Sequence, residues 1–174
     1  SVSSLLRTQF EWFYPLSEQH QIQFKIDAPK ELYWNTDSVY FKKILANLIS
    51  NAFKYTEDGG TVRISLHEEE NFLVLKVYNT GKGIEEADMQ NIFDRYRILG
   101  TMDNDDNRQN TARNGLGLFI CHSLVQSLGG KIDIESEVGQ YAEFTVTLPF
   151  GIVEESSDDT IDEDIPVSLP SPNT

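Results

Sequence analysis

The stretch Asn47-Leu-Ile-Ser-Asn51-Ala-Phe-Lys54-Tyr55-Thr56 forms the second half of a long helical pattern that opens near Asp37. Asn47, Asn51 and Lys54 stand at i, i+4 and i+7, so they share one face of the helix. This polar face is either the solvated flank of a core helix or the wall of a ligand site. The face beside it is apolar at helical spacing and is expected to face a core: Phe41, Ile44, Leu45, Leu48, Ile49 and Ala52.

The composition fits a single globular domain. The chain has 174 residues, of which 39% are hydrophobic and 24% charged. Its formal charge of −14, without clusters of Lys or Arg, excludes a nucleic-acid surface. Seven acids and no Lys or Arg fall within residues 151–174, which leaves −7 for the other residues.

Few signals bear on the cellular compartment. Cys121 is the single cysteine, which excludes an internal disulfide framework and fits a reducing compartment. No apolar run approaches the length of a membrane span, and no signal-peptide pattern opens the chain. We therefore expect a soluble cytoplasmic domain without direct membrane contact. Any membrane-spanning segment of a parent protein is expected outside this sequence.

Hydrophobic periodicity and turn residues predict the order of elements. The first half reads as a helical end over residues 1–20 with Pro15 near its stop, a strand over 21–26, a short strand over 31–34, the long helix over 37–54, and a hairpin of strands over 61–66 and 72–78. The second half reads as a short helix over 85–93, a polar lid-like loop over 99–114, a helix from Gly115 to about 129, and a hairpin over 131–136 and 142–148.

This order predicts an α+β two-layer sandwich: a mixed, mostly antiparallel sheet covered on one face by about three helices. We place the main domain at 21–149. Residues 150–174 combine high charge, low hydrophobicity and several prolines, which is typical of a disordered linker.

Two glycine-rich turns flank the lid. Asn79-Thr-Gly81-Lys-Gly83-Ile84 follows a strand, and Gly115-Leu116-Gly117-Leu118 is expected to open a helix, where backbone N–H groups could cradle a phosphate. Such turns usually only connect elements, and neither the Walker nor the Rossmann pattern is present. Their combination with paired asparagines and a lid favours a ligand site.

At these residues the chain resembles the catalytic and ATP-binding domain of sensor histidine kinases, within the wider superfamily of Bergerat-fold ATPases that includes gyrase and Hsp90. Residues 47–56 resemble the N box of that family and residues 79–84 its G1 box. Residues 92–97 resemble the F box, and residues 115–118 the G2 box. The residues of the N box, the strand end at Trp34 and the acidic C-terminal segment are similar to those of hybrid kinases of Bacteroides-type bacteria.

The resemblance implies ATP and Mg²⁺ as ligands. Asn51 would give its side-chain oxygen to Mg²⁺, and Lys54 and Tyr55 would touch phosphate or ribose. Asn47 stands where ATPase relatives have a water-activating glutamate, so the γ-phosphoryl would be kept for a protein nucleophile. Asn47, Lys54 and Arg97 are the implied catalytic residues. The implied nucleotide contacts are Asn47, Asn51, Lys54, Tyr55, Asn79, Gly81, Gly83, Ile84, Gly115, Leu116, Gly117 and Leu118.

Several positions depart from the family pattern. Asn79 replaces an aspartate that accepts the adenine amine, which predicts weaker or altered base selection. Arg113 replaces the first glycine of the G2 box, Tyr141-Ala142 replaces a Gly-Thr pair, and the F box is one residue short. These departures favour a second hypothesis, a non-catalytic interaction module with the same fold. A third, an independent ATPase, is disfavoured by Asn47.

The resemblance also implies partners. None of His20, His67 and His122 has the acceptor pattern of a helical histidine followed by an acid and then a proline. The acceptor is therefore expected on a dimerisation domain of the same protein, with residues 1–20 as its end. If the parent protein is a hybrid kinase, a response-regulator receiver domain would follow the acidic linker. The parent protein is expected to be an inner-membrane sensor.

Overall fold

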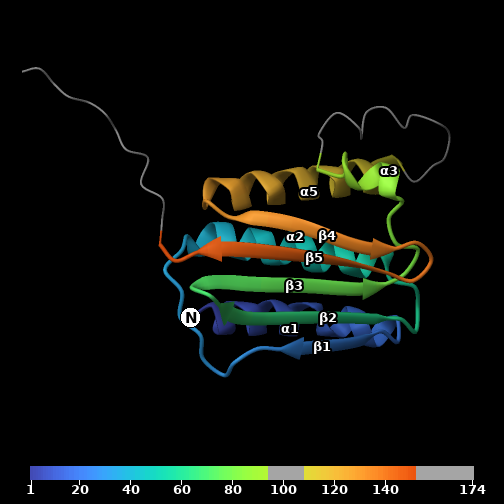
Figure 1. The fold of residues 1–174 in the computed structure, drawn as a ribbon. Coiled ribbons are helices and arrows are strands. Elements are labelled where there is room, and N and C mark those ends of the chain that lie inside the picture. The colour runs from blue at the N-terminus through green and yellow to red at the C-terminus, as the bar shows by residue number, and fades with distance from the viewer. Residues whose placement is uncertain (94–107, 152–174) are drawn as a thin grey trace, which may run out of the picture.

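A computed structural model describes residues 1–93 and 108–151. For residues 108–116 it describes the backbone alone. Its five strands form one sheet in the order β1-β2-β3-β5-β4 (Figure 1). β1 pairs in parallel with β2, and the other pairs are antiparallel. The predicted two-layer α+β sandwich is thereby confirmed. The elements are α1 (Val2–Gln19), β1 (Gln23–Asp27), α2 (Ser38–Tyr55), β2 (Thr61–Glu69), β3 (Phe72–Thr80), α3 (Glu86–Met89), α5 (Arg108–Ser127), β4 (Lys131–Glu137) and β5 (Tyr141–Pro149).

The helices α1, α2 and α5 lie on one face of the sheet, with α2 between the other two (Figure 1). The apolar face predicted for α2 is fully buried, and alternate residues of the strands meet it, as in Val62, Ile64 and Leu66 of β2. Burying each such side chain contributes about 1.5–3 kcal/mol. The core therefore fixes which face of α2 remains for the polar residues.

The ends of α2 are set by its sequence. The Asp37 carboxylate accepts hydrogen bonds from the backbone N–H groups of Val39 (2.8 Å) and Tyr40 (2.9 Å), a cap that contributes about 1 kcal/mol. At the other end the Thr56 hydroxyl donates to the carbonyl of Ala52 at 2.7 Å. The predicted start near Asp37 and stop near Lys54 are confirmed.

The first helix has the extent predicted for it. α1 ends at Gln19, four residues after Pro15, so the helical end predicted over 1–20 is confirmed. A proline inside a helix removes one backbone hydrogen bond and crowds the preceding turn, and packing of α1 against the core offsets this cost. Val2 and Leu6 are buried in the same core as α2, and the Val2 N–H donates to the Leu32 carbonyl at 2.9 Å.

Three expected elements are corrected. Residues 31–34 form no strand; instead the Trp34 indole N–H donates to the Pro149 carbonyl at 3.0 Å. The helix expected over 85–93 is confined to Glu86–Met89. The helix expected to open at Gly115 begins at Arg108, so the last residues of the expected loop are helical. Residues 31–34 are not a strand because none of the described strands pairs with them, and local sequence pattern does not report pairing.

Candidate functional site

Asn51 is the buried polar residue at the centre of the candidate site. α2 holds it next to the core, where it is only 6% exposed. Among the described residues its side-chain oxygen Oδ1 has no hydrogen-bond partner. An unsatisfied buried acceptor costs about 1–3 kcal/mol, so this oxygen is a candidate for contact with a ligand.

Asn47, one turn earlier, faces α5. Its Oδ1 lies 3.6 Å from the position that a β-carbon on Gly117 would occupy. This contact joins the N box to the G2 box across the α2–α5 packing. Gly117 lies within α5 and not at a helix start as expected, while its contact with a phosphate stays a prediction. Leu118 is 5% exposed and packs in the core, while only the backbone of Gly115 and Leu116 is described.

Gly81 joins the G1 box to the C-terminal end of α2. A β-carbon at Gly81 would overlap the carbonyl oxygen of Tyr55, so only glycine allows this approach. Gly83 has a φ of +67°, and a β-carbon there would overlap the Glu137 carbonyl. Both glycines therefore serve close backbone packing, which brings the G1 box against α2 on one side and β4 on the other.

Backbone tethers hold the G1 box to the turn between β4 and β5. The Gly81 N–H donates to the Gln140 carbonyl (3.1 Å), and the Gly139 N–H donates to the Lys82 carbonyl (2.7 Å). The Ile84 N–H donates to the Ser136 hydroxyl (2.8 Å), which in turn donates to the Tyr141 carbonyl (2.7 Å). Sequence reasoning missed Ser136, because a serine in an alternating strand carries no signal of such a role.

Asn79 is 3% exposed at the end of β3, where it lies opposite Ala142 of β5. Its Nδ2 donates to the Thr80 carbonyl at 3.1 Å. An aspartate at this position would only accept hydrogen bonds, whereas the amide nitrogen of Asn79 donates and needs an acceptor. The carbonyl of Thr80 supplies that acceptor within the protein. In this arrangement the side chain keeps Oδ1 as the atom able to accept a hydrogen bond from a ligand.

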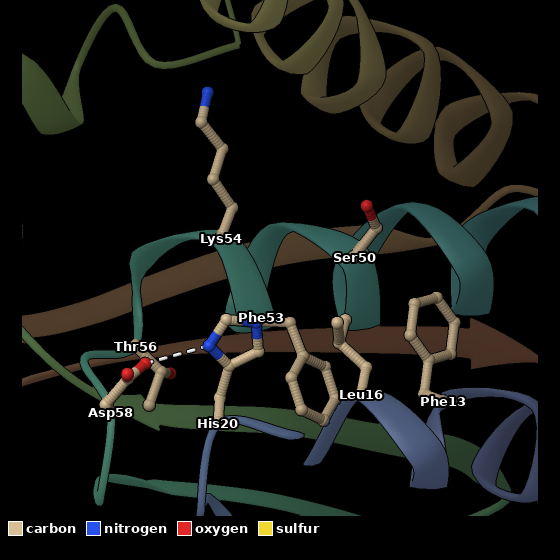
Figure 2. A pocket seen from close by; sticks show the side chains of 8 residues that line it. All are labelled: Phe13, Leu16, His20, Ser50, Phe53, Lys54, Thr56 and Asp58. Carbon is tan, nitrogen blue, oxygen red and sulfur yellow. Dashed lines mark hydrogen bonds and ion pairs between the residues drawn. The ribbon is translucent and has the colours of Figure 1, made fainter. Parts of the chain in front are cut away.

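Lys54 and Tyr55 form the exposed end of the site. The Lys54 ammonium lies 5.2 Å from the centre of the Tyr55 ring, within cation–π distance. Partial burial lowers the pKa of Lys54 and raises the pKa of Tyr55. Figure 2 shows Lys54 extending away from Phe53 on the opposite side of α2.

The F box is anchored to α5. The Phe93 ring stacks on His122, with ring centres 4.9 Å apart and planes at 16°, and meets the edge of Phe144 at 6.4 Å. His122 is thus a packing residue. Arg97 lies outside the described residues, as does most of the expected lid, so its role stays a prediction.

The other two histidines lie away from the paired asparagines. His20 Nδ1 is 2.9 Å from the Asp58 carboxylate at the end of α1, and His67 Nε2 is 3.4 Å from Glu69 at the end of β2. His67 belongs to a strand, which agrees with its rejection as a helical phosphoacceptor. The absence of an acceptor within the whole chain stays a prediction.

Comparison with known proteins supplies the family. Residues 36–152 match the model described as "Histidine kinase-, DNA gyrase B-, and HSP90-like ATPase". The chain belongs to this ATPase family. Sensor protein SrrB of Staphylococcus aureus (strain NCTC 8325 / PS 47) is 36% identical over 120 residues, which are 69% of this chain and 20% of SrrB. The chain therefore spans about a fifth of that relative's length.

Solved structures in this ATPase family are similar in fold. The catalytic domain of histidine kinase ThkA, in a nucleotide-free form, has a TM-score of 0.71 at 25% identity, covering 86% of this chain and 92% of that one. Full-length ShkA in complex with AMPPNP has a TM-score of 0.70 at 24% identity, covering 87% of this chain and 30% of that one. The likeness to ShkA shows the fold alone.

The residues present suit a phosphate-bound metal better than a metal held by protein alone. Nowhere in the described residues do three His, Cys, Asp or Glu side chains gather in a way that could hold an ion. Mg²⁺ commonly binds through one or two protein oxygens together with substrate phosphates, and the unpartnered Oδ1 of Asn51 is such an oxygen.

Proposed function

We propose that the chain is the ATP-binding catalytic domain of a sensor histidine kinase, and that it delivers the γ-phosphoryl group of ATP to a histidine on a separate dimerisation domain. The observation that carries this proposal is the buried Oδ1 of Asn51, for which the described residues supply no hydrogen-bond donor. It lies on α2 between two contacts, Asn47 with Gly117 and Tyr55 with Gly81, which gather the N, G1 and G2 boxes around one helix.

In this proposal the chain binds and orients ATP rather than reacting covalently with it. Asn51 would hold Mg²⁺, which supplies charge neutralisation at the phosphates. Lys54 adds a positive charge at the exposed end of the same helix. Asn79 would accept a hydrogen bond from the adenine amine through Oδ1. Positioning and electrostatics of this kind are the main demands of phosphoryl transfer.

Asn47 would keep the γ-phosphoryl from water. Its amide has no useful basicity, so it cannot take a proton from an attacking water molecule. Its place beside Gly117 puts this neutral amide at the α2–α5 boundary. The phosphoryl group would then be transferred to a protein histidine.

The partners follow from the proposed activity. They are a histidine-containing dimerisation domain of the same protein and a response-regulator receiver domain; the kinase ThkA has been solved in complex with the response regulator TrrA. No described helix has the length and apolar character needed to cross a membrane. We place the domain in the cytoplasm, as part of an inner-membrane sensor.

Calorimetric titration with ATP and Mg²⁺ tests the proposal. We expect saturable binding that depends on Mg²⁺, and a loss of at least about tenfold in affinity, or 1.4 kcal/mol, for Asn51→Ala. Asn35→Ala, an exposed asparagine at the opposite end of α2, is the matched control and should bind like the parent. Absence of binding at millimolar nucleotide would overturn the proposal in favour of a non-catalytic interaction module.

A further inference from the structure

A pocket of about 320 Å³ lies between the C-terminal parts of α1 and α2 (Figure 2). Phe13 and Leu16 of α1 and Phe53 of α2 give the pocket an apolar lining, while the pair of His20 and Asp58 closes one end. We call this feature the α1/α2 pocket. Ser50, Lys54 and Thr56 complete its lining.

Exposed apolar and basic residues lie on α1 and α2 outside the pocket. Trp12 is 79% exposed and stands four residues before the pocket residue Leu16, so both lie along the same edge of α1. Val39, 55% exposed, and the exposed Lys42 and Lys43 lie nearer the N-terminus of α2. A large exposed tryptophan on the same helix edge as a pocket residue is typical of an interaction surface.

The C-terminal part of this chain has the complementary composition. Residues 152–174, which we call the acidic tail, contain seven acids and no Lys or Arg. Ile161 and Ile165 stand four residues apart within its most acidic part. Acidic and apolar residues together match the lysines of α2 and the apolar lining of the α1/α2 pocket.

The acidic tail also starts close to the N-terminus of α2. The Gly151 N–H donates to the Asn35 carbonyl at 2.8 Å, two residues before the residue that caps α2. Figure 1 shows the end of β5 and the segment entering α2 meeting at one side of the molecule. Ile161 stands ten positions after Gly151, a length of chain that can span about 33 Å, whereas the 18 residues of α2 cover about 27 Å.

We propose that the acidic tail docks in the α1/α2 pocket of its own chain. Its first acids pair with Lys42 and Lys43, and Ile161 and Ile165 pack into the pocket beside Trp12. The pocket shares Lys54 with the proposed nucleotide site, but docking is measured without nucleotide, so its failure and the failure of the proposed kinase function can be distinguished.

Paramagnetic broadening in the full chain tests this docking. A nitroxide is attached at Ser168→Cys in a Cys121→Ala background, and the indole N–H signals of the chain's two tryptophans, Trp12 and Trp34, are compared. We expect the Trp12 signal to lose far more intensity than the Trp34 signal, which lies near the start of the tail. At about 1 M salt, where the Debye length is only about 3 Å, the difference should shrink.

Charge reversals provide the matched controls. The double variant Lys42→Glu, Lys43→Glu should abolish the preferential broadening of Trp12, whereas Lys25→Glu, Lys76→Glu, on the face of the sheet that the helices leave uncovered, should preserve it. Equal broadening of both tryptophans, or no effect of the α2 reversals, would overturn the proposal. Broadening of an isotope-labelled chain by a separate spin-labelled chain would also overturn it, because the occupant would then be a second copy.

Discussion

Gly81 lies against the carbonyl oxygen of Tyr55, so close that a β-carbon on Gly81 would overlap that oxygen. This single approach joins the strand β3 and its glycine turn to the end of α2. Because Tyr55 directly follows Lys54 and lies one turn after Asn51, any displacement of the turn changes the wall of the proposed nucleotide site.

Substituting Gly81→Ala should therefore reduce both stability and nucleotide binding. We expect a loss of about 2 kcal/mol or more in the free energy of unfolding, measured in urea, because the clash involves backbone that cannot move aside cheaply. Gly139→Ala is the control: its φ is +79° but a β-carbon meets nothing within 4 Å, so it should lose only about 1–2 kcal/mol and keep nucleotide affinity. Equal losses for both variants would contradict this explanation.

Asn51→Ala should separate stability from binding. Removing a buried acceptor without a partner should leave the unliganded domain as stable as the parent or stabilise it by about 1 kcal/mol, while nucleotide affinity falls. Thermal unfolding with and without ATP and Mg²⁺ measures both quantities. A large loss of stability in the unliganded protein would show that Asn51 is instead a structural residue.

Ser3 is a second buried polar residue whose removal can be tested, and no ligand is proposed at its site. Its hydroxyl is fully buried in α1 and has no hydrogen-bond partner among the described residues. Ser3→Ala should stabilise the domain by about 1 kcal/mol and leave nucleotide affinity unchanged. Destabilisation measured by urea unfolding would indicate that the hydroxyl has a partner in solution.

Asn47→Glu should raise ATP hydrolysis by the isolated domain. The carboxylate introduces a base at the position where the amide of Asn47 has none, so attacking water can be deprotonated. Steady-state phosphate release is the measurement, and Asn47→Gln, which lengthens the side chain without adding a base, is the control. If the two variants hydrolyse ATP equally slowly, the absent carboxylate is not what suppresses hydrolysis.

Cys121 should make stability depend on alkaline pH. Burial raises the pKa of its thiol from 9.0 to about 12, so the unfolded chain loses the proton first. The stability that the neutral thiol contributes is complete below pH 9 and is lost progressively between pH 9 and about 12. Urea unfolding across this range should show a smaller decline for Cys121→Ala; an identical decline would point to other groups.

Much of the fold was predictable because it depends on periodicity. The alternation of β2 and the helical spacing of α2 each leave one apolar face, and a single core can satisfy both. Local pattern failed where long-range contacts decide. Residues 31–34 read as a strand, yet they form none, and the indole N–H of Trp34 donates to the carbonyl of Pro149, 115 residues away.

The sequence by itself determined which polar residues share a face of α2 and which glycines flank the lid, because both are properties of local spacing. Only the tertiary structure decided what those residues meet. It buries the Oδ1 atom of Asn51 where the described residues offer it no donor, sets Asn47 beside Gly117 inside a helix, and brings Gly81 against Tyr55. The physical reason is that burial and close backbone approach arise from packing between elements far apart in the chain, which no local pattern contains.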